Sequence, residues 1–277
     1  MFSIKSEPLS IERLTIAIAN FPPSLHNTKI VQLSDFHYAK GQLSEPLLNQ
    51  AIAASNFEKP DLVVLTGDYI TDDPSPIYPL AMKLKQLTSR TGIYAILGNH
   101  DIYYPQSQPI VTKALTQAGI KVLWNEIAYP FGQEFPLVGL ADLWSKDFFP
   151  NRIMNQLDPQ TPRLILSHNP DTAAMLKQWR VDLQLSGHTH GGQIVLPILG
   201  PLPQYISRVR KYTPKVIQPF IPYLKKECDQ VLKHWEWAQG LHQVGNNYLY
   251  VSRGLGSYFP GRLFCPPEVT VLTLIRA

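Results

Sequence analysis

The chain alternates short apolar runs with segments of helical spacing, and no other feature of the sequence constrains its fold as much. The apolar runs are rich in Leu, Ile and Val and have the length of buried strands. They are 29–34, 61–66, 92–97, 136–140, 163–167 and 182–186. The segments with helical spacing are 45–56, 76–89, 108–118 and 171–179, and two later runs, 248–252 and 268–275, are predicted to be closing strands. This order indicates a layered α/β fold.

Composition narrows the class of protein. A chain of 277 residues can bury a core without disulfides, and 44% hydrophobic with 17% charged residues is typical of a soluble globular protein. Cys228 and Cys265 are therefore expected to be reduced thiols. No run approaches the ~20 apolar residues of a membrane-spanning helix, and residues 1–20 lack the basic start and apolar core of a signal peptide. The expected location is the cytoplasm.

Segment 194–237 interrupts the alternation with six prolines and six aromatic residues. Prolines at this density break regular structure, so the segment is predicted to be an insertion or lid within a single domain that spans residues 1–277. Residues 194–240 carry seven bases and three acids, which accounts for the whole net charge of +4. Such a segment suits an anionic membrane surface or the acyl chains of a lipid substrate. The alternative is a solvated loop whose aromatics fold onto the core. Basicity confined to one segment argues against specific nucleic-acid binding.

Polar residues with metal-binding chemistry recur directly after the predicted strands. They are Asp35 and His37, Asp68, the group Asn99, His100 and Asp101, His168, and the pair His188 and His190. Ligands of open α/β sheets bind beyond the carboxyl ends of the strands, so five distant segments are predicted to meet at one edge. Each motif alone could be a turn or a cap, but five of the eight histidines fall within them, and the joint pattern indicates a metal site.

The donor types and their number indicate two metal ions. Carboxylate, amide oxygen and imidazole together suit Mn²⁺, Fe or Zn²⁺. Seven ligands are too many for one tetrahedral ion and suit two ions that share a carboxylate. Two such ions can clamp the attacking and leaving oxygens at phosphorus and produce hydroxide from water at neutral pH.

At these residues the sequence resembles the calcineurin-like metallophosphoesterases, from Asp35 through His190 and more loosely to the end of the chain. The resemblance implies an α/β fold with four layers, an α/β/β/α sandwich of two mixed sheets with flanking helices and a dinuclear site at one edge. It also implies that one metal is bound by Asp35, His37 and His190, that the other is bound by Asn99, His168 and His188, and that Asp68 bridges them.

The resemblance gives His100 a catalytic role, in which it contacts the scissile phosphate or protonates the leaving oxygen. Asp101 is expected to orient His100, with a plain helix N-cap as the alternative. Arg253 and Arg262 are candidates to grip a second phosphate of the substrate, and structural ion pairing is the alternative for both.

Three stretches narrow the resemblance to a bacterial membrane-associated branch that is related to UDP-2,3-diacylglucosamine pyrophosphatases of lipid A biosynthesis. They are Gly187–Gln193, Ser252–Gly256 and the stretch from Arg262 to Glu268. Protein phosphatases have an Asp-Arg pair after the Gly-Asp turn, whereas residues 67–72 of this chain read Gly-Asp-Tyr-Ile-Thr-Asp and include no arginine, so the sequence argues against protein phosphatase activity.

The sequence thus predicts an enzyme that hydrolyses a phosphodiester or pyrophosphate by means of a metal-bound hydroxide, with two divalent ions and Mn²⁺ as the first choice. The predicted substrate is lipid-linked, such as UDP-2,3-diacylglucosamine, and the enzyme would act in the cytoplasm with peripheral contact to the inner face of an anionic membrane. One alternative is a general soluble phosphodiesterase acting on nucleotides. Another is a metal-binding scaffold without catalysis.

Overall fold

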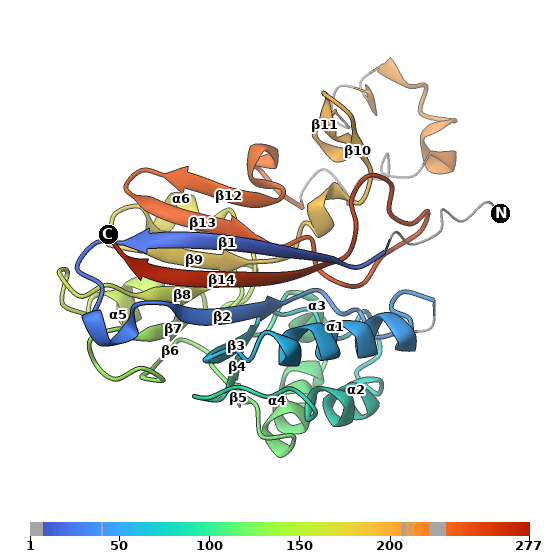
Figure 1. The fold of residues 1–277 in the computed structure, drawn as a ribbon. Helices are drawn as coiled ribbons and strands as arrows, with labels where there is room; N and C mark the ends of the chain where they lie inside the picture. The colour runs from blue at the N-terminus through green and yellow to red at the C-terminus, as the bar shows by residue number, and fades with distance from the viewer. Residues whose placement is uncertain (1–7, 40, 206–208, 211, 222–230) are drawn as a thin grey trace.

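Two six-stranded mixed sheets form the centre of the protein in the computed structural model, which describes residues 8–39, 41–205, 209–210, 212–221 and 231–277 (Figure 1). The first sheet has the order β1 (Ser10–Ile18), β14 (Glu268–Arg276), β2 (Thr28–Leu33), β3 (Leu62–Leu65), β4 (Ile93–Ala95) and β5 (Lys121–Val122). The second has the order β12 (Gly240–Val244), β13 (Asn247–Val251), β9 (Leu183–Ser186), β8 (Leu164–Leu166), β7 (Leu137–Gly139) and β6 (Glu126–Ala128). Neighbouring strands are parallel except in the pairs β14–β2, β12–β13 and β6–β7.

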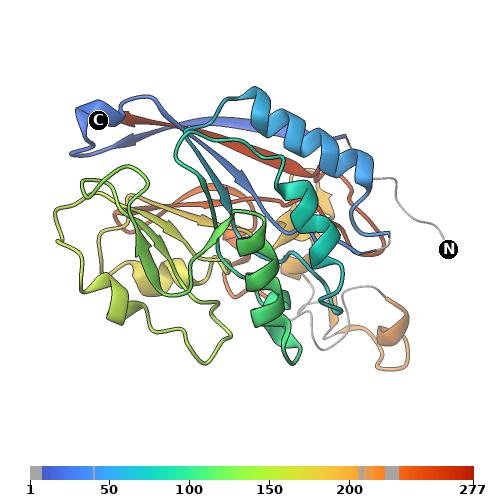
Figure 2. The same cartoon turned by 90° about the horizontal axis from the view of Figure 1, so that it is seen from below.

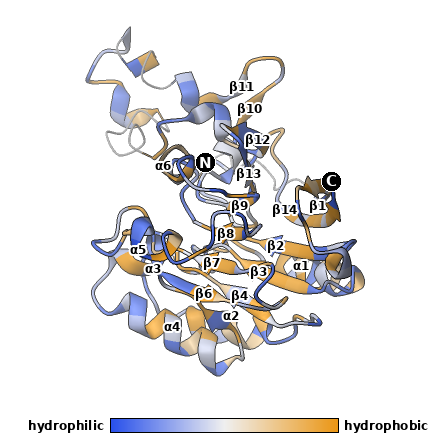
Figure 3. Ribbon diagram, turned by 90° about the vertical axis from the view of Figure 1, so that its left-hand side faces the viewer, coloured by the Kyte–Doolittle hydropathy of each residue, from blue (hydrophilic) through white to orange (hydrophobic). Residues whose placement is uncertain are grey.

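The strands carry apolar side chains on both faces, so each sheet is packed against other elements on both of its faces. Ile30 and Leu62 of the first sheet pack with Leu164 and Leu183 of the second in a core between the sheets, and Figure 3 shows these central strands as hydrophobic. The side chain of Val31 points to the other face, where the first sheet packs against the helices α1 (Glu45–Phe57), α2 (Ile77–Leu84) and α4 (Ser107–Gln117) (Figure 2).

The outer face of the second sheet packs against the short helices α5 (Pro150–Met154) and α6 (Thr172–Leu176). Met154 and Leu176 of these helices contact a cluster that includes Val138 and Ile165. The helices and sheets therefore stack as α/β/β/α, and the predicted four-layer sandwich is confirmed.

All eight predicted strands are present, with boundaries within two residues of those expected. The helix predicted at 76–89 already ends at Leu84, and the one at 171–179 covers only Thr172–Leu176. The edge strands β1, β5, β6 and β12, the one-turn helix α3 (His100–Tyr103) and helix α5 were not predicted.

Segment 194–237 holds, in its described residues, the short pair β10 (Val195–Leu196) and β11 (Gly200–Pro201) and several 3-10 turns. In Figure 1 this segment projects from the end of the sandwich where β9 leads into it. Several of its predicted features, Arg208, Lys211, Tyr223 and Cys228 among them, lie outside the described residues, and its role as an insertion or lid stays a prediction. None of the described helices is both long and apolar enough to cross a bilayer.

Candidate metal centre

The carboxyl ends of five strands, three from one sheet and two from the other, deliver the predicted ligands to one place. In the first sheet, Asp35 and His37 follow β2, Asp68 follows β3 and Asn99 follows β4. In the second sheet, His168 follows β8, and His188 and His190 follow β9. All seven side chains are buried. The structure therefore brings together every ligand predicted from the sequence.

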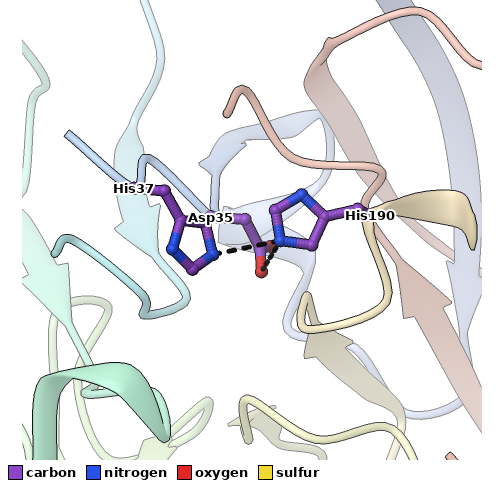
Figure 4. Close-up of side chains that lie close together, drawn as sticks. All are labelled: Asp35, His37 and His190. Carbon is purple, nitrogen blue, oxygen red and sulfur yellow. Dashed lines mark hydrogen bonds and ion pairs between the residues drawn. The ribbon is translucent and has the colours of Figure 1, made fainter. Parts of the chain in front are cut away.

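Asp35, His37 and His190 form the first cluster (Figure 4). Their ligand atoms lie within 4.8 Å of one another. His190 Nε2 is 3.0 Å from His37 Nε2 and 3.7 Å from Asp35 Oδ1. Two imidazole nitrogens and a carboxylate oxygen thus point at one small volume.

Asp68, His168 and His188 form the second cluster, again within 4.8 Å. His188 Nδ1 lies 3.3 Å from His168 Nε2 and 2.8 Å from Asn99 Oδ1. Asp68 Oδ2 is 3.1 Å from His168 Nε2 and 3.4 Å from His37 Nε2. Asp68 therefore lies between the two clusters, where a bridging carboxylate would have to be.

Three of the four buried imidazoles turn one nitrogen to the clusters and the other to a backbone carbonyl. In the fourth, His37, the hydroxyl of a tyrosine described below lies 2.7 Å from Nδ1 and 3.2 Å from Nε2. His168 Nδ1 is 2.7 Å from the Thr66 carbonyl, and His190 Nδ1 is 3.2 Å from that of Gly256. His188 Nε2 is 2.9 Å from the Val231 carbonyl. An N–H held in this way leaves the opposite nitrogen as a lone-pair donor, which is the usual arrangement of metal-binding histidines.

The backbone is strained where the ligands lie. Five of the seven have a positive φ, namely Asp35 (52°), His37 (41°), Asp68 (57°), His188 (74°) and His190 (51°). Residues other than glycine rarely adopt this conformation, and such strain gathers at functional sites. A Cβ at Gly98 would clash with Asp68 Oδ1, so the turn after β4 needs glycine to let the carboxylate approach.

Burial and neighbouring charges set the protonation of the site. Burial lowers the pKa of His37, of His190 and of His188, the last to about 3, so these rings are neutral and able to bind a cation. Burial alone would raise the pKa of Asp68, but His168 and His100 lower it well below its ordinary value. Burial likewise opposes a charge on His168, yet Asp68 raises the pKa of His168 to about 10. Without a metal ion, His168 is therefore protonated on the nitrogen that faces Asp68. A bound cation would take the place of that proton.

The residues fit a pair of divalent cations. Asp35 Oδ2 is buried and, within the described part of the chain, has no hydrogen-bond partner. Leaving a buried carboxylate oxygen unpaired is costly unless a cation pairs with it. Carboxylate, imidazole and amide donors converge from both sides of Asp68, which suits two first-row divalent ions sharing that carboxylate.

Asp101 contacts the backbone of two ligand turns. Its carboxylate accepts hydrogen bonds from the backbone N–H groups of Asp68 (2.8 Å), Gly98 (2.8 Å) and Tyr69 (2.9 Å). His100 Nδ1 instead lies 2.8 Å from the Thr71 carbonyl, which orients the ring. Asp101 therefore ties together the turns after β3 and β4, and the expected contact with His100 is not found among the described residues.

His100 itself lies where the sequence placed it, half-buried beside the two clusters. Its backbone N–H donates to Asp68 Oδ1 at 3.0 Å, and its Nδ1 is held by Thr71. Its Nε2 therefore faces the clusters, 3.3 Å from the hydroxyl of a tyrosine described below. A ligand atom of His100 lies within 4.8 Å of those of His37 and Asp68.

The surroundings of Arg253 and Arg262 favour structural pairing over contact with a phosphate. Arg262 is completely buried and donates to the backbone carbonyls of Gly256 (2.5 Å) and Arg253 (2.7 Å). Arg253 pairs with Glu12 and, at 2.7 Å, with Glu268. Both guanidinium groups are engaged inside the protein, and their role in gripping a phosphate stays a prediction.

Three residues of the site were missed by sequence reasoning. The Tyr258 hydroxyl is the group that lies 2.7 Å from His37 Nδ1, and it is 3.3 Å from His100 Nε2. Asp142, after β7, is buried, which raises its pKa to about 6. Trp144 packs edge-on against His188 with ring centroids 4.9 Å apart. Asp142 could have been found, since it also follows a predicted strand, whereas no motif marks Tyr258 or Trp144.

The fold and the site together define an α/β protein with a candidate metal centre, and comparisons with known proteins agree. Residues 28–192 match the model of the calcineurin-like phosphoesterase family. Phosphodiesterase YaeI of Escherichia coli is 33% identical, over 97% of this chain and 90% of its own length. The uncharacterized metallophosphoesterase YkuE of Bacillus subtilis is 33% identical, over 97% and 87%. UDP-2,3-diacylglucosamine pyrophosphatase LpxG of Chlamydia muridarum is 28% identical, over 95% and 88%.

The chain belongs to the calcineurin-like phosphoesterase family, and the predicted resemblance is confirmed. It is a metal-dependent hydrolase of phosphoric esters or anhydrides.

Proposed function

We propose that the protein hydrolyses phosphodiesters or pyrophosphates with two divalent cations, of which Mn²⁺ is the first choice, held by the seven residues of the two clusters. The observation that carries the proposal is the orientation of three buried imidazoles, those of His168, His188 and His190. Each has one nitrogen bonded to a backbone carbonyl and the other facing Asp68, Asn99 or Asp35. Bound cations would supply positive charge to the phosphate oxygens and lower the pKa of water.

The protein's own contribution is orientation and proton transfer. Thr71 fixes the His100 ring through Nδ1, so that Nε2 can give its proton to the leaving oxygen as the P–O bond breaks. Asp101 holds the Asp68 and Gly98 backbones and thereby keeps the bridging carboxylate in place. These groups are rigid before substrate binds, which is the condition for electrostatic catalysis.

The surroundings of the site favour diesters or pyrophosphates over monoesters. A phosphomonoester dianion calls for an additional cationic side chain, but the stretch 67–72 after β3 reads Gly-Asp-Tyr-Ile-Thr-Asp and holds no arginine. Arg253 and Arg262, the other candidates, are occupied by Glu268 and by backbone carbonyls. A diester carries one negative charge less and needs no such group.

The proposed substrate is lipid-linked, with UDP-2,3-diacylglucosamine as the specific candidate. The relation to LpxG supports this choice. So does segment 194–237, where Ile198, Tyr212, Val216 and Phe220 are largely exposed, near the basic Lys215. Apolar and cationic side chains together suit acyl chains and anionic headgroups, so we also propose peripheral contact with the inner face of the membrane.

A substrate panel tests the proposed reaction. The purified protein with Mn²⁺ is incubated with UDP-2,3-diacylglucosamine, bis(4-nitrophenyl) phosphate and 4-nitrophenyl phosphate. The proposal expects UMP and lipid phosphate from the first substrate, and slower or no release of nitrophenol from the monoester. Hydrolysis of the soluble diester without turnover of the lipid would reject the lipid-linked substrate and leave the diesterase, and preference for the monoester would reject both.

A second candidate, a soluble phosphodiesterase acting on nucleotides, is favoured by the 33% identity to the phosphodiesterase YaeI. Sedimentation with phosphatidylglycerol vesicles separates the two candidates. The membrane proposal expects binding of the wild type, and loss of binding in the double variant V216S/F220S. F57S is the matched control because Phe57 is equally exposed (81% against 83% for Phe220) but lies on α1. No sedimentation of the wild type would favour the soluble enzyme. The scaffold alternative is opposed by the presence of His100 together with every predicted ligand.

A further inference from the structure

The loop between β13 and β14 is attached to the site along its backbone. The N–H of Leu255 donates to the Ser34 carbonyl (3.0 Å) and that of Gly256 donates to the Asp35 carbonyl (2.7 Å). The N–H of Tyr258 donates to Gln193 Oε1 at 2.6 Å. The loop is therefore fixed to the first ligand turn on one side and to the segment after His190 on the other.

Arg262 also holds this loop in place. Its buried guanidinium donates to the carbonyls of Gly254 (3.2 Å) and Gly256 (2.5 Å), and the same Gly256 carbonyl lies against His190 Nδ1. A side chain carried by such a loop has a defined position. The side chain in question is that of Tyr258.

The Tyr258 hydroxyl lies beside the His37 ring, 2.7 Å from Nδ1 and 3.2 Å from Nε2. His37 Nε2 also faces Asp68 Oδ2 (3.4 Å) and His190 Nε2 (3.0 Å), so Nε2 is the nitrogen available to a cation. When Nε2 binds a cation, Nδ1 carries the proton, and neither nitrogen can then accept the hydroxyl hydrogen. That hydrogen is left to donate to another group.

The position of His100 indicates where the Tyr258 hydroxyl hydrogen can be donated. Since His100 Nδ1 donates to the Thr71 carbonyl, its Nε2 is the nitrogen that faces the reaction, and Nε2 is 3.3 Å from the Tyr258 oxygen. Any oxygen that receives the proton of His100 Nε2 lies within reach of the Tyr258 hydroxyl. We propose that Tyr258 is a second catalytic residue, which donates a hydrogen bond to the leaving-group oxygen beside His100.

This inference rests on the proposed function and assigns a role within the same site. As the P–O bond breaks, the leaving oxygen takes the proton from His100 Nε2, while Tyr258 keeps its own proton and stabilises the developing charge with its O–H group. The hydrogen bond matters most when the leaving oxygen is strongly basic. Substrates with poor leaving groups should therefore depend on Tyr258 more than substrates with good ones.

The test compares wild type and Tyr258→Phe on a series of methyl aryl phosphodiesters, from 4-nitrophenol to unsubstituted phenol as leaving group, with Mn²⁺ in excess. For phenol, kcat/KM should fall ~10- to 100-fold, and for 4-nitrophenol by less than about 3-fold. Bound metal, measured by plasma mass spectrometry, should not change. Tyr248→Phe is the matched control, since Tyr248 lies exposed on β13.

An equal loss across the series, or no loss, would overturn the inference, because a residue that only positions His37 affects all leaving groups alike. Loss of metal from Tyr258→Phe would overturn it as well. If the wild type cleaves no member of the series, the proposed function falls and takes this inference with it. If the wild type is active and the Tyr258→Phe profile is flat, the inference alone falls.

Discussion

His100 differs from the other imidazoles of the site in both exposure and connection. It is half-buried, whereas His37, His168, His188 and His190 are buried. Its Nε2 is 3.3 Å from the Tyr258 hydroxyl, whereas the other four rings belong to the two clusters. Among the histidines of the site, it is therefore the one that can exchange a proton with a substrate.

Replacing His100 with Ala should reduce kcat on a phosphodiester by ~10²- to 10⁴-fold, the usual contribution of a positioned general acid. The metal content should stay at the wild-type value, because the seven proposed ligands are untouched. His26→Ala is the control and should be fully active, because His26 is exposed and is distant from His100 in the sequence. Loss of metal from the His100→Ala protein would make His100 a ligand and contradict the assignment.

Asp101 acts on the backbone rather than on a substrate. In Asp101→Asn, one of the two oxygens is replaced by an NH₂ group that faces the N–H donors of Asp68, Tyr69 and Gly98, so at least one buried donor loses its partner. The free energy of unfolding should fall by about 1–3 kcal/mol, measured by urea denaturation in the presence of a chelator. Asp73→Asn, at an exposed turn, should leave it nearly unchanged. An inactive Asp101→Asn protein of wild-type stability would restore the expected role beside His100.

At the scale of elements, what could be predicted depended on burial. Strands in the middle of each sheet are covered on both faces and read as continuous apolar runs, as Leu62–Leu65 does. The edge strand β1 alternates buried and exposed positions and includes Glu12 and Arg13, so its sequence gives no such run. The polar residues after the strands were predictable because the ends of parallel strands share one edge.

The remaining site residues depend on how distant elements pack. Tyr258 reaches His37 because the chain crosses from the second sheet to the first between β13 and β14, and sequence spacing alone does not reveal that path. The surroundings of Arg262 were unpredictable for a related reason. A sequence displays its charge, but its burial among the Gly254 and Gly256 carbonyls is a product of the fold.

The ion-pair cluster around Glu58 connects three elements and makes stability depend on pH. Glu58 caps the end of α1 and pairs with Arg13 of β1 (2.5 Å) and Lys29 of β2 (3.1 Å). Burial opposes its charge, but the two cations together lower its pKa below the ordinary 4.5. A lowered folded-state pKa means that the stabilisation is present above the unfolded-state value and is lost as the pH falls through the folded-state pKa.

The free energy of unfolding is expected to differ between wild type and Glu58→Gln by an amount that depends on pH. At pH 7 the variant should be less stable, by no more than about 1 kcal/mol for pairs this exposed. The difference should shrink as the pH falls below 4.5. Urea denaturation of both proteins between pH 3 and pH 7 measures it. A difference that is constant over this range would show that Glu58 acts through packing instead of charge.

At the scale of the whole molecule, the fold and the metal site are supported by different interactions. The apolar cores between and outside the sheets include none of the proposed ligands. The ligands lie on turns at the ends of strands, in strained conformations held by hydrogen bonds such as those of Asp101. Removal of the cations should therefore loosen these turns and leave the sandwich folded.

Dialysis against a chelator should abolish phosphodiesterase activity, and added Mn²⁺ should restore it, while the far-ultraviolet circular dichroism stays unchanged. Because cations bind the folded chain, they should raise Tm, by about 5–10 °C at 100-fold saturation for a chain of this size. Asp68→Asn weakens the carboxylate shared by both clusters and is the matched control: its Tm should respond far less to Mn²⁺. If the wild type is fully active after exhaustive chelation and retains no metal by elemental analysis, then the strained turns, the orphaned Asp35 oxygen and the oriented imidazoles have some other cause, and the dinuclear centre is wrong.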